Sequence, residues 1–182
     1  MRTDITKLRV ECIVNAANEA GLGCFTPNHP CIDNAIHKAA GPGLLAECTR
    51  LPEVRKGVRV PTGTARITLG HKLPCRYVIH ATGPSLRSAA ARPDYRTLAQ
   101  TYVACLDLAK LNGIHEIAFC CISTGIFGYD KREAAATAIG TVGTWLQQVH
   151  DRKAWRVIFV TFTDEDEAIY TTKLADLLRA NR

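Results

Sequence analysis

An uninterrupted apolar run from residue 117 to residue 122 constrains the fold of this chain more than any other feature. A strand buried on both faces has to be apolar along its whole length, and such strands occur in parallel sheets that helices cover. Further strands are predicted in residues 12–14, 64–69, 77–81 and 157–162. Helical apolar spacing alternates with them, in residues 32–40, 44–51, 98–109, 134–149 and 169–178. This alternation predicts an α/β fold with helices on both faces of a largely parallel sheet.

The size and composition of the chain predict one compact, soluble domain. With 182 residues and 47% hydrophobic content, the chain can fill one core but is too short for two ordinary domains. No apolar run reaches the length of a membrane span, and residues 1–7 lack the apolar stretch of a signal peptide. We therefore expect a cytoplasmic protein with no membrane partner. Several of the eight cysteines fall in apolar core runs, which favours reduced thiols.

The formal net charge of +6 does not select a partner by itself. It would suit RNA, a membrane surface or a phosphorylated small molecule equally well. The basic residues are scattered, and no aromatic residues interleave with them as a base-stacking platform requires. Nucleic acid is therefore not an expected partner, because an RNA-binding function would rest on charge alone. The sequence carries no signal of oligomeric state.

A cluster of metal-binding side chain types follows the first predicted strand. Cys24, His29 and Cys31 have the spacing C-x4-H-x-C, with Pro27 and Pro30 stiffening the loop between them. Two sulfurs and one imidazole nitrogen favour zinc, and three ligands without a fourth leave a position open, as in catalytic sites. The alternative is that the cysteines are small buried hydrophobes and His29 is an ordinary loop histidine.

Asp33 is the candidate acid or base beside this cluster. The apolar spacing from Ile32 to Ala40 predicts a helix that ends at Gly41, so Asp33 lies in its first turn. His37 is four residues on, shares the face of Asp33 and would orient it by a hydrogen bond, or else is a helix-surface residue. The alternative role for Asp33 is to cap the helix.

Polar or glycine-bearing segments follow three of the predicted strands, and Phe162 lies at the end of a fourth. Ligands of such sheets bind outside the carboxyl ends of the strands, so these segments should line one crevice. Residues 123–128 join a strand to a helix and expose backbone N–H groups suited to a phosphate, unless Gly125 and Gly128 serve only the turn geometry. No dinucleotide-binding or P-loop glycine motif is present. The segments are residues 15–18, 82–84, 123–128 and Phe162.

Six short motifs follow one another along the chain: Asp4-Ile5-Thr6, residues 13–18, Ala39-Ala40-Gly41, residues 63–68, residues 78–84 and residues 122–129. In the order and spacing of these motifs, the chain resembles the macrodomain family, the ADP-ribose-binding modules. The resemblance implies a three-layer α/β/α sandwich with a mixed, largely parallel central sheet. It implies a single macrodomain-like domain over residues 1–182 that lacks the family's usual N-terminal edge strand. Residues 24–37 further resemble the zinc-containing branch, whose members hydrolyse mono-ADP-ribose from proteins.

The resemblance also implies a role for individual residues. Asp4 would accept a hydrogen bond from the adenine amino group, Ile5 would contact the ring through its backbone, and Phe162 would stack on it. Asn18 would hold the distal ribose at the catalytic centre, where Asp33 would activate or orient water. Zinc on Cys24, His29 and Cys31 would sit near the anomeric carbon. The backbone wrapping the diphosphate would be that of Ser123, Thr124, Gly125, Ile126 and Phe127, with Phe127 also packing beside the ribose.

The function that follows is zinc-dependent hydrolysis of mono-ADP-ribose from modified proteins. The expected partners are ADP-ribose and a mono-ADP-ribosylated protein. Zinc would lower the pKa of a water molecule or polarise a leaving oxygen, and the sequence leaves both roles open. The alternative function is a non-catalytic module that reads ADP-ribosylated partners without cleaving them.

Overall fold

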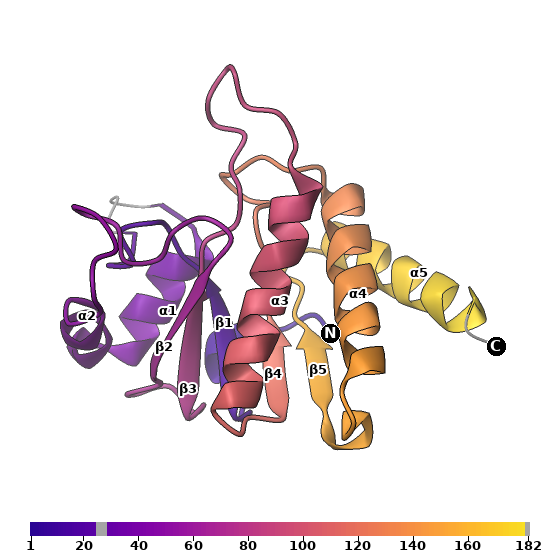
Figure 1. The fold of residues 1–182 in the computed structure, drawn as a ribbon, viewed down its shortest axis with the longest axis horizontal. Helices are drawn as coiled ribbons and strands as arrows, with labels where there is room; N and C mark the ends of the chain where they lie inside the picture. The colour runs from indigo at the N-terminus through magenta and orange to yellow at the C-terminus, as the bar shows by residue number, and fades with distance from the viewer. Residues whose placement is uncertain (25–28, 181–182) are drawn as a thin grey trace.

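The computed structural model describes residues 1–24 and 29–180, and in these residues five strands form one sheet in the order β2-β3-β1-β4-β5 (Figure 1). β1, β3, β4 and β5 run parallel, and β2 is antiparallel to β3 at one edge. The sheet is therefore mixed and mostly parallel, as expected. The strands are β1 (Cys12–Ala16), β2 (Ala65–Leu69), β3 (Tyr77–Ala81), β4 (Glu116–Phe119) and β5 (Arg156–Phe159).

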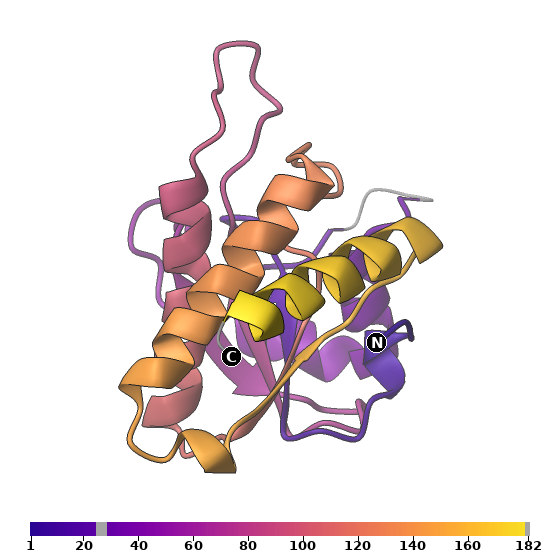
Figure 2. The ribbon, with the colours of Figure 1, turned by 90° about the vertical axis from the view of Figure 1, so that its right-hand side faces the viewer.

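Helices cover both faces of the sheet. α3 and α4 lie side by side over one face, and α1 lies over the other with α2 beside it (Figures 1 and 2). α5 packs beside α4 at the β5 end of the sheet, where the rings of Phe159 and Tyr170 are 5.3 Å apart. The predicted three-layer α/β/α architecture is confirmed. The α-helices are α1 (Ile32–Ala40), α2 (Pro42–Cys48), α3 (Tyr95–Leu111), α4 (Lys131–Gln148) and α5 (Asp164–Ala180).

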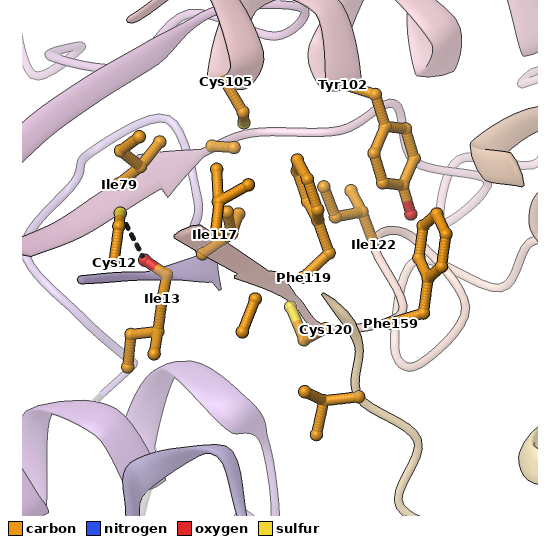
Figure 3. Packing of buried hydrophobic residues seen from close by; sticks show 14 of the residues in the cluster. Cys12, Ile13, Ile79, Tyr102, Cys105, Ile117, Phe119, Cys120, Ile122 and Phe159 are labelled. Carbon is orange, nitrogen blue, oxygen red and sulfur yellow. Dashed lines mark hydrogen bonds between the residues drawn. The ribbon is translucent and has the colours of Figure 1, made fainter. Parts of the chain in front are cut away.

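The central strands are buried on both faces, which explains their continuous apolar sequence. Ile13, Val14 and Phe119 have no exposed surface. Figure 3 shows side chains of β1 and β4 packed beneath Tyr102 and Cys105 of α3, with the Tyr102 and Phe119 rings 5.1 Å apart. Burial of the core thiols raises their pKa, so these cysteines act as small apolar groups.

Several boundaries differ from the sequence prediction for identifiable reasons. β4 and β5 end at Phe119 and Phe159, three residues before their predicted ends, because their paired registers with the neighbouring strands stop there. α3 begins at Tyr95, before its first buried apolar residue, because the Asp94 carboxylate accepts a hydrogen bond from the Thr97 N–H at 2.9 Å and caps the helix. The acidic residues at 164–167 form the first turn of α5, as predicted.

The edge of the sheet beyond β5 is paired by the start of the chain. The Thr161 N–H donates to the Met1 carbonyl at 3.0 Å, and the Thr3 N–H donates to the Thr161 carbonyl at 3.3 Å. Arg2 and Thr161 form an isolated parallel bridge. Residues 1–3 therefore cover part of this edge, where the resemblance implied that the usual N-terminal edge strand is missing.

The long connection before β2 is fastened to the loop after β1. The Glu19 carboxylate accepts hydrogen bonds from the Thr62 N–H and hydroxyl at 3.0 and 3.1 Å, and it pairs with Arg55 at 3.3 Å. The hydrogen bond from the Thr62 N–H is the main reason why the pKa of Glu19 is lowered.

No helix in the described part of the chain has the length and apolar character needed to cross a membrane.

Candidate functional site

Asp33 is a buried carboxylate at the start of α1. It is 3% exposed, and its Oδ1 accepts a hydrogen bond of 2.7 Å from Nδ2 of Asn15 at the end of β1. His37 lies one turn along α1, with its Nε2 3.6 Å from the same oxygen. Burial raises the pKa of Asp33 to about 6, although the hydrogen bond from Asn15 lowers it. A carboxyl group that titrates near neutral pH is suited to handling a proton.

The capping alternative for Asp33 is wrong. The N-cap of α1 is Cys31, whose Sγ lies 3.4 Å from the Asn34 N–H. Asp33 belongs to the first turn, as predicted, but its carboxylate faces Asn15 rather than the free N–H groups of the helix. Helix capping therefore does not explain why the side chain of Asp33 points towards Asn15.

The predicted metal ligands converge. Sγ of Cys24 lies 3.2 Å from Nδ1 of His29, and one ligand atom each from Cys24, His29 and Cys31 lies within 4.8 Å of the other two. Zinc bonds of about 2.0–2.3 Å place tetrahedral ligand atoms at comparable separations, so the donor set fits zinc in both geometry and chemistry. All three residues are partly exposed, which leaves the ligand atoms accessible. Pro27, expected to stiffen this loop, lies outside the described residues.

A second group of metal-binding side chain types is better explained as an internal hydrogen-bond network. One ligand atom each from His37, Cys48 and His80 lies within 4.8 Å of the others, and all three residues are buried. Both ring nitrogens of His80 already contact polar groups, namely Asn15 and Thr68. Burial raises the pKa of the Cys48 thiol to about 12, so this thiol is protonated at neutral pH. A metal bound here would have to break the contacts of the His80 ring and remove the proton from the Cys48 thiol.

Asn18 shapes the loop that leads to the metal ligands. Its Nδ2 donates to the Gly23 carbonyl at 3.2 Å, and its Oδ1 accepts from the Gly21 N–H at 3.3 Å. Gly23 has a φ of +90°, and a Cβ added there would lie 3.0 Å from the His37 ring. The loop therefore passes directly over His37, and Asn18 holds it there.

Residues 123–128 form a glycine-bearing loop at the carboxyl end of β4. Ser123 is a non-glycine residue with a φ of +67°, and its carbonyl accepts from the Tyr129 N–H at 3.0 Å. Gly128, with a φ of +74°, serves the turn geometry. A Cβ added to Gly125, however, would meet nothing within 4 Å, so the turn does not require glycine there. The open space over Gly125 leaves its backbone accessible to a ligand, and Ile126 beside it is 45% exposed.

The residues predicted to bind adenine lie beside the paired first residues of the chain. Because Thr3 pairs with Thr161, Asp4 and Phe162 follow adjacent positions. Phe162 is 80% exposed, so its ring is available for stacking. Asp4 Oδ1 accepts from the Thr6 N–H and hydroxyl at 3.0 and 2.6 Å. The Ile5 side chain is buried in the core, which leaves its backbone as the part suited to a ligand.

Buried oxygens at the carboxyl ends of the four parallel strands have no hydrogen-bond partner among the described residues. Each belongs to a residue that is at most 4% exposed. Buried polar atoms are normally paired, so their grouping at one edge of the sheet indicates a place for water or a polar ligand. They are Asn15 Oδ1, Thr82 Oγ1, Ser123 Oγ and Thr161 Oγ1.

The family model described as the Macro domain matches residues 14–138 of this chain. The chain belongs to the macrodomain family. This macrodomain is 37% identical to the Oceanobacillus iheyensis macrodomain with ADP, at a TM-score of 0.86, covering 98% of this chain and 90% of that one. It is 34% identical to the Trypanosoma brucei macrodomain in complex with ADP-ribose, at a TM-score of 0.80, covering 95% of this chain and 67% of that one.

Curated relatives of this macrodomain carry the name protein-ADP-ribose hydrolase. The protein from Treponema medium is 44% identical over 169 residues, which cover 93% of this chain. A Staphylococcus aureus protein of the same name is 40% identical over 168 residues, which cover 92% of this chain. The matched residues span 64% and 62% of the length of these two relatives.

Sequence reasoning missed the part that two residues of this macrodomain's site play beside Asp33. Asn15 was expected only as part of the polar segment at residues 15–18 that lines the crevice, and His80 only as part of a buried strand. The two residues are paired in register on β1 and β3, and both are fully buried. Each is a polar residue within an otherwise apolar strand, which was the available signal. Their relation to Asp33 depends on the strand order, which the sequence did not specify.

Proposed function

We propose that this macrodomain hydrolyses mono-ADP-ribose from modified proteins, with zinc held by Cys24, His29 and Cys31. The observation that carries the proposal is the Asp33 carboxylate, which is buried and two residues from the Cys31 thiol, at the carboxyl end of the sheet. Its raised pKa has burial as its main cause. The names of the curated relatives and the ADP-ribose complex of the Trypanosoma brucei macrodomain support the same substrate class.

Different residues along the sheet edge would bind different parts of ADP-ribose. The loop at 123–128 would receive the diphosphate on backbone N–H groups, and Asp4 with Phe162 would hold the adenine. Asn18 would bind the distal ribose and so place its anomeric carbon near Asp33. Fixing the reacting carbon beside a catalytic group converts binding energy into rate.

Hydrolysis breaks the bond between the anomeric carbon and the acceptor side chain and adds water to that carbon. Asp33 would take the proton from the attacking water, and the leaving acceptor group would gain a proton. Zinc would supply Lewis-acid chemistry beside the scissile bond. Asn15 would keep the carboxylate of Asp33 in place through their hydrogen bond of 2.7 Å.

The proposal is tested by incubating the purified protein with a mono-ADP-ribosylated protein, with and without a chelator. Release of ADP-ribose that the chelator abolishes and added zinc restores is expected. His29→Ala should behave like the chelated protein. His115→Ala is the matched control, because His115 is a surface residue paired with Asp151 at 3.1 Å, just before the amino end of β4. ADP-ribose binding without any release would instead identify a reader module.

A further inference from the structure

The side-chain amide of Asn15 lies between two acceptors. Its Nδ2 is 2.7 Å from Oδ1 of Asp33 and 3.2 Å from Nδ1 of His80. An amide nitrogen carries two hydrogens, so it can donate to both atoms at once. Asn15 has no exposed surface, so bulk solvent does not reach these hydrogens.

His80 has the protonation state that this arrangement requires. It is fully buried on β3, directly opposite Asn15 in the strand register. Burial lowers the pKa of His80 to about 3, so the ring is neutral and has one donor and one acceptor nitrogen. Because Nδ1 faces the amide of Asn15, Nδ1 is the acceptor and Nε2 carries the hydrogen. Nε2 then donates to Oγ1 of Thr68 at 2.9 Å.

We propose that His80 is a positioning residue, which acts through Asn15 to hold the carboxylate of Asp33 in its reactive orientation. This inference rests on the proposed function, in which Asp33 handles the proton. Without an acceptor at residue 80, one hydrogen of the Asn15 amide loses its partner, and only the hydrogen bond to Asp33 keeps the amide from turning. A turned amide presents its oxygen to the carboxylate, and two like partial charges repel.

Thr68 provides a matched control within the same cluster. Thr68→Val removes the acceptor of the His80 Nε2–H, but it leaves Nδ1 facing Asn15. Sγ of Cys48, 3.7 Å from Nε2, can take the hydrogen instead. Thr68→Val and His80→Leu therefore both remove a buried polar contact, and only the second removes the acceptor of the Asn15 amide. His80→Asn restores an acceptor oxygen close to the position of Nδ1.

The experiment measures kcat and KM on a mono-ADP-ribosylated protein, the Kd for ADP-ribose by calorimetry, and the thermal midpoint. His80→Leu should lower kcat by about 10–100-fold, the usual effect of losing a partner that orients a reacting group, with little change in the Kd for ADP-ribose. Thr68→Val and His80→Asn should both keep kcat within about threefold of the wild type. A general loss of packing would not produce rescue by asparagine.

Wild-type kcat in a folded His80→Leu protein, an equal loss in Thr68→Val, or no rescue in His80→Asn would each overturn the positioning role. If His80→Leu does not fold, Asn15→Ser decides the matter, because one hydroxyl cannot serve both acceptors. Full turnover in a folded Asn15→Ser protein would overturn the inference. A wild-type protein that binds ADP-ribose but never releases it would instead overturn the proposed function itself.

Discussion

Replacing Asp33 by asparagine should stabilise the protein and disable it at the same time. The pKa of Asp33 is raised from its ordinary 3.8 to about 6, mainly by burial. An acid whose pKa is higher in the folded state resists ionisation there, so the ionised form lowers the free energy of unfolding above pH 6. This loss of stability disappears as the pH falls from 6 to 3.8, because the carboxyl group is then protonated in the folded state and increasingly in the unfolded state. About two pKa units correspond to roughly 3 kcal/mol at pH 7, which Asp33→Asn should recover in part, because the amide carries no charge.

The same substitution should lower turnover by about a hundredfold, or roughly 2.7 kcal/mol of activation free energy, because an amide cannot take a proton from water. Metal content and the Kd for ADP-ribose should stay unchanged. Urea unfolding at pH 7 and release of ADP-ribose from a modified protein measure the two effects on one preparation.

Asp130→Asn is the matched control for this prediction. The Asp130 carboxylate is exposed and caps α4, accepting from the Arg132 and Glu133 N–H groups at 2.9 Å. Asparagine caps a helix about as well as aspartate, so both stability and turnover should change little. Asp33→Asn with unchanged turnover would refute the proton-handling role, and a lower urea midpoint would refute the account of its burial.

Three further outcomes are expected. The purified protein should contain about one zinc per chain by elemental analysis, and His29→Ala should lose it while keeping its thermal midpoint; a wild type that neither contains nor takes up metal would contradict the assignment. Asp4→Ala should raise KM more than it lowers kcat, because it acts on the adenine. Thr6→Ala, which removes only a hydroxyl hydrogen bond to Asp4, is its control, and equal kinetics in the two variants would count against adenine contact. Acid should destabilise the wild type through His80, whose neutral form is favoured at a pKa of about 3 against an ordinary 6.5. Between pH 6.5 and 5 the His80 effect alone costs about 2 kcal/mol, and the falling cost of ionised Asp33 offsets part of it. In urea titrations over this range, His80→Asn should therefore lose less stability than the wild type.

The sequence predicted the fold well wherever a local pattern and its end signal coincided. β3 matches its predicted bounds, and α1 runs from Ile32 to Ala40 and ends at Gly41 as expected. The starts of α3 and α4 were placed late, because Asp94 and Asp130 begin these helices through capping rather than apolar periodicity. The ends of β4 and β5 depend on pairing with neighbouring strands, a tertiary property that apolar length does not reveal.

The candidate site was predictable in its residue types but less so in its internal contacts. The convergence of Cys24, His29 and Cys31 followed from short spacing in one loop, and the structure brings their ligand atoms together. The partner of Asp33 could not be predicted in the same way. Asn15 is 18 residues away on another element, and its contact with Asp33 exists only because β1 lies beneath α1.

The close approach of Gly23 to His37 couples two positions that a sequence would present as independent. Any side chain at residue 23 would have to adopt a φ of +90° and displace the His37 ring, which a new Cβ would approach to 3.0 Å. A directed-evolution library randomised at residue 23 alone should therefore return glycine. Larger residues should become accessible only in libraries where residue 37 is varied at the same time. The order in which the two changes are acquired then matters. A smaller side chain at residue 37 makes room for a later change at residue 23, whereas a larger residue at 23 acquired first would clash with the His37 ring.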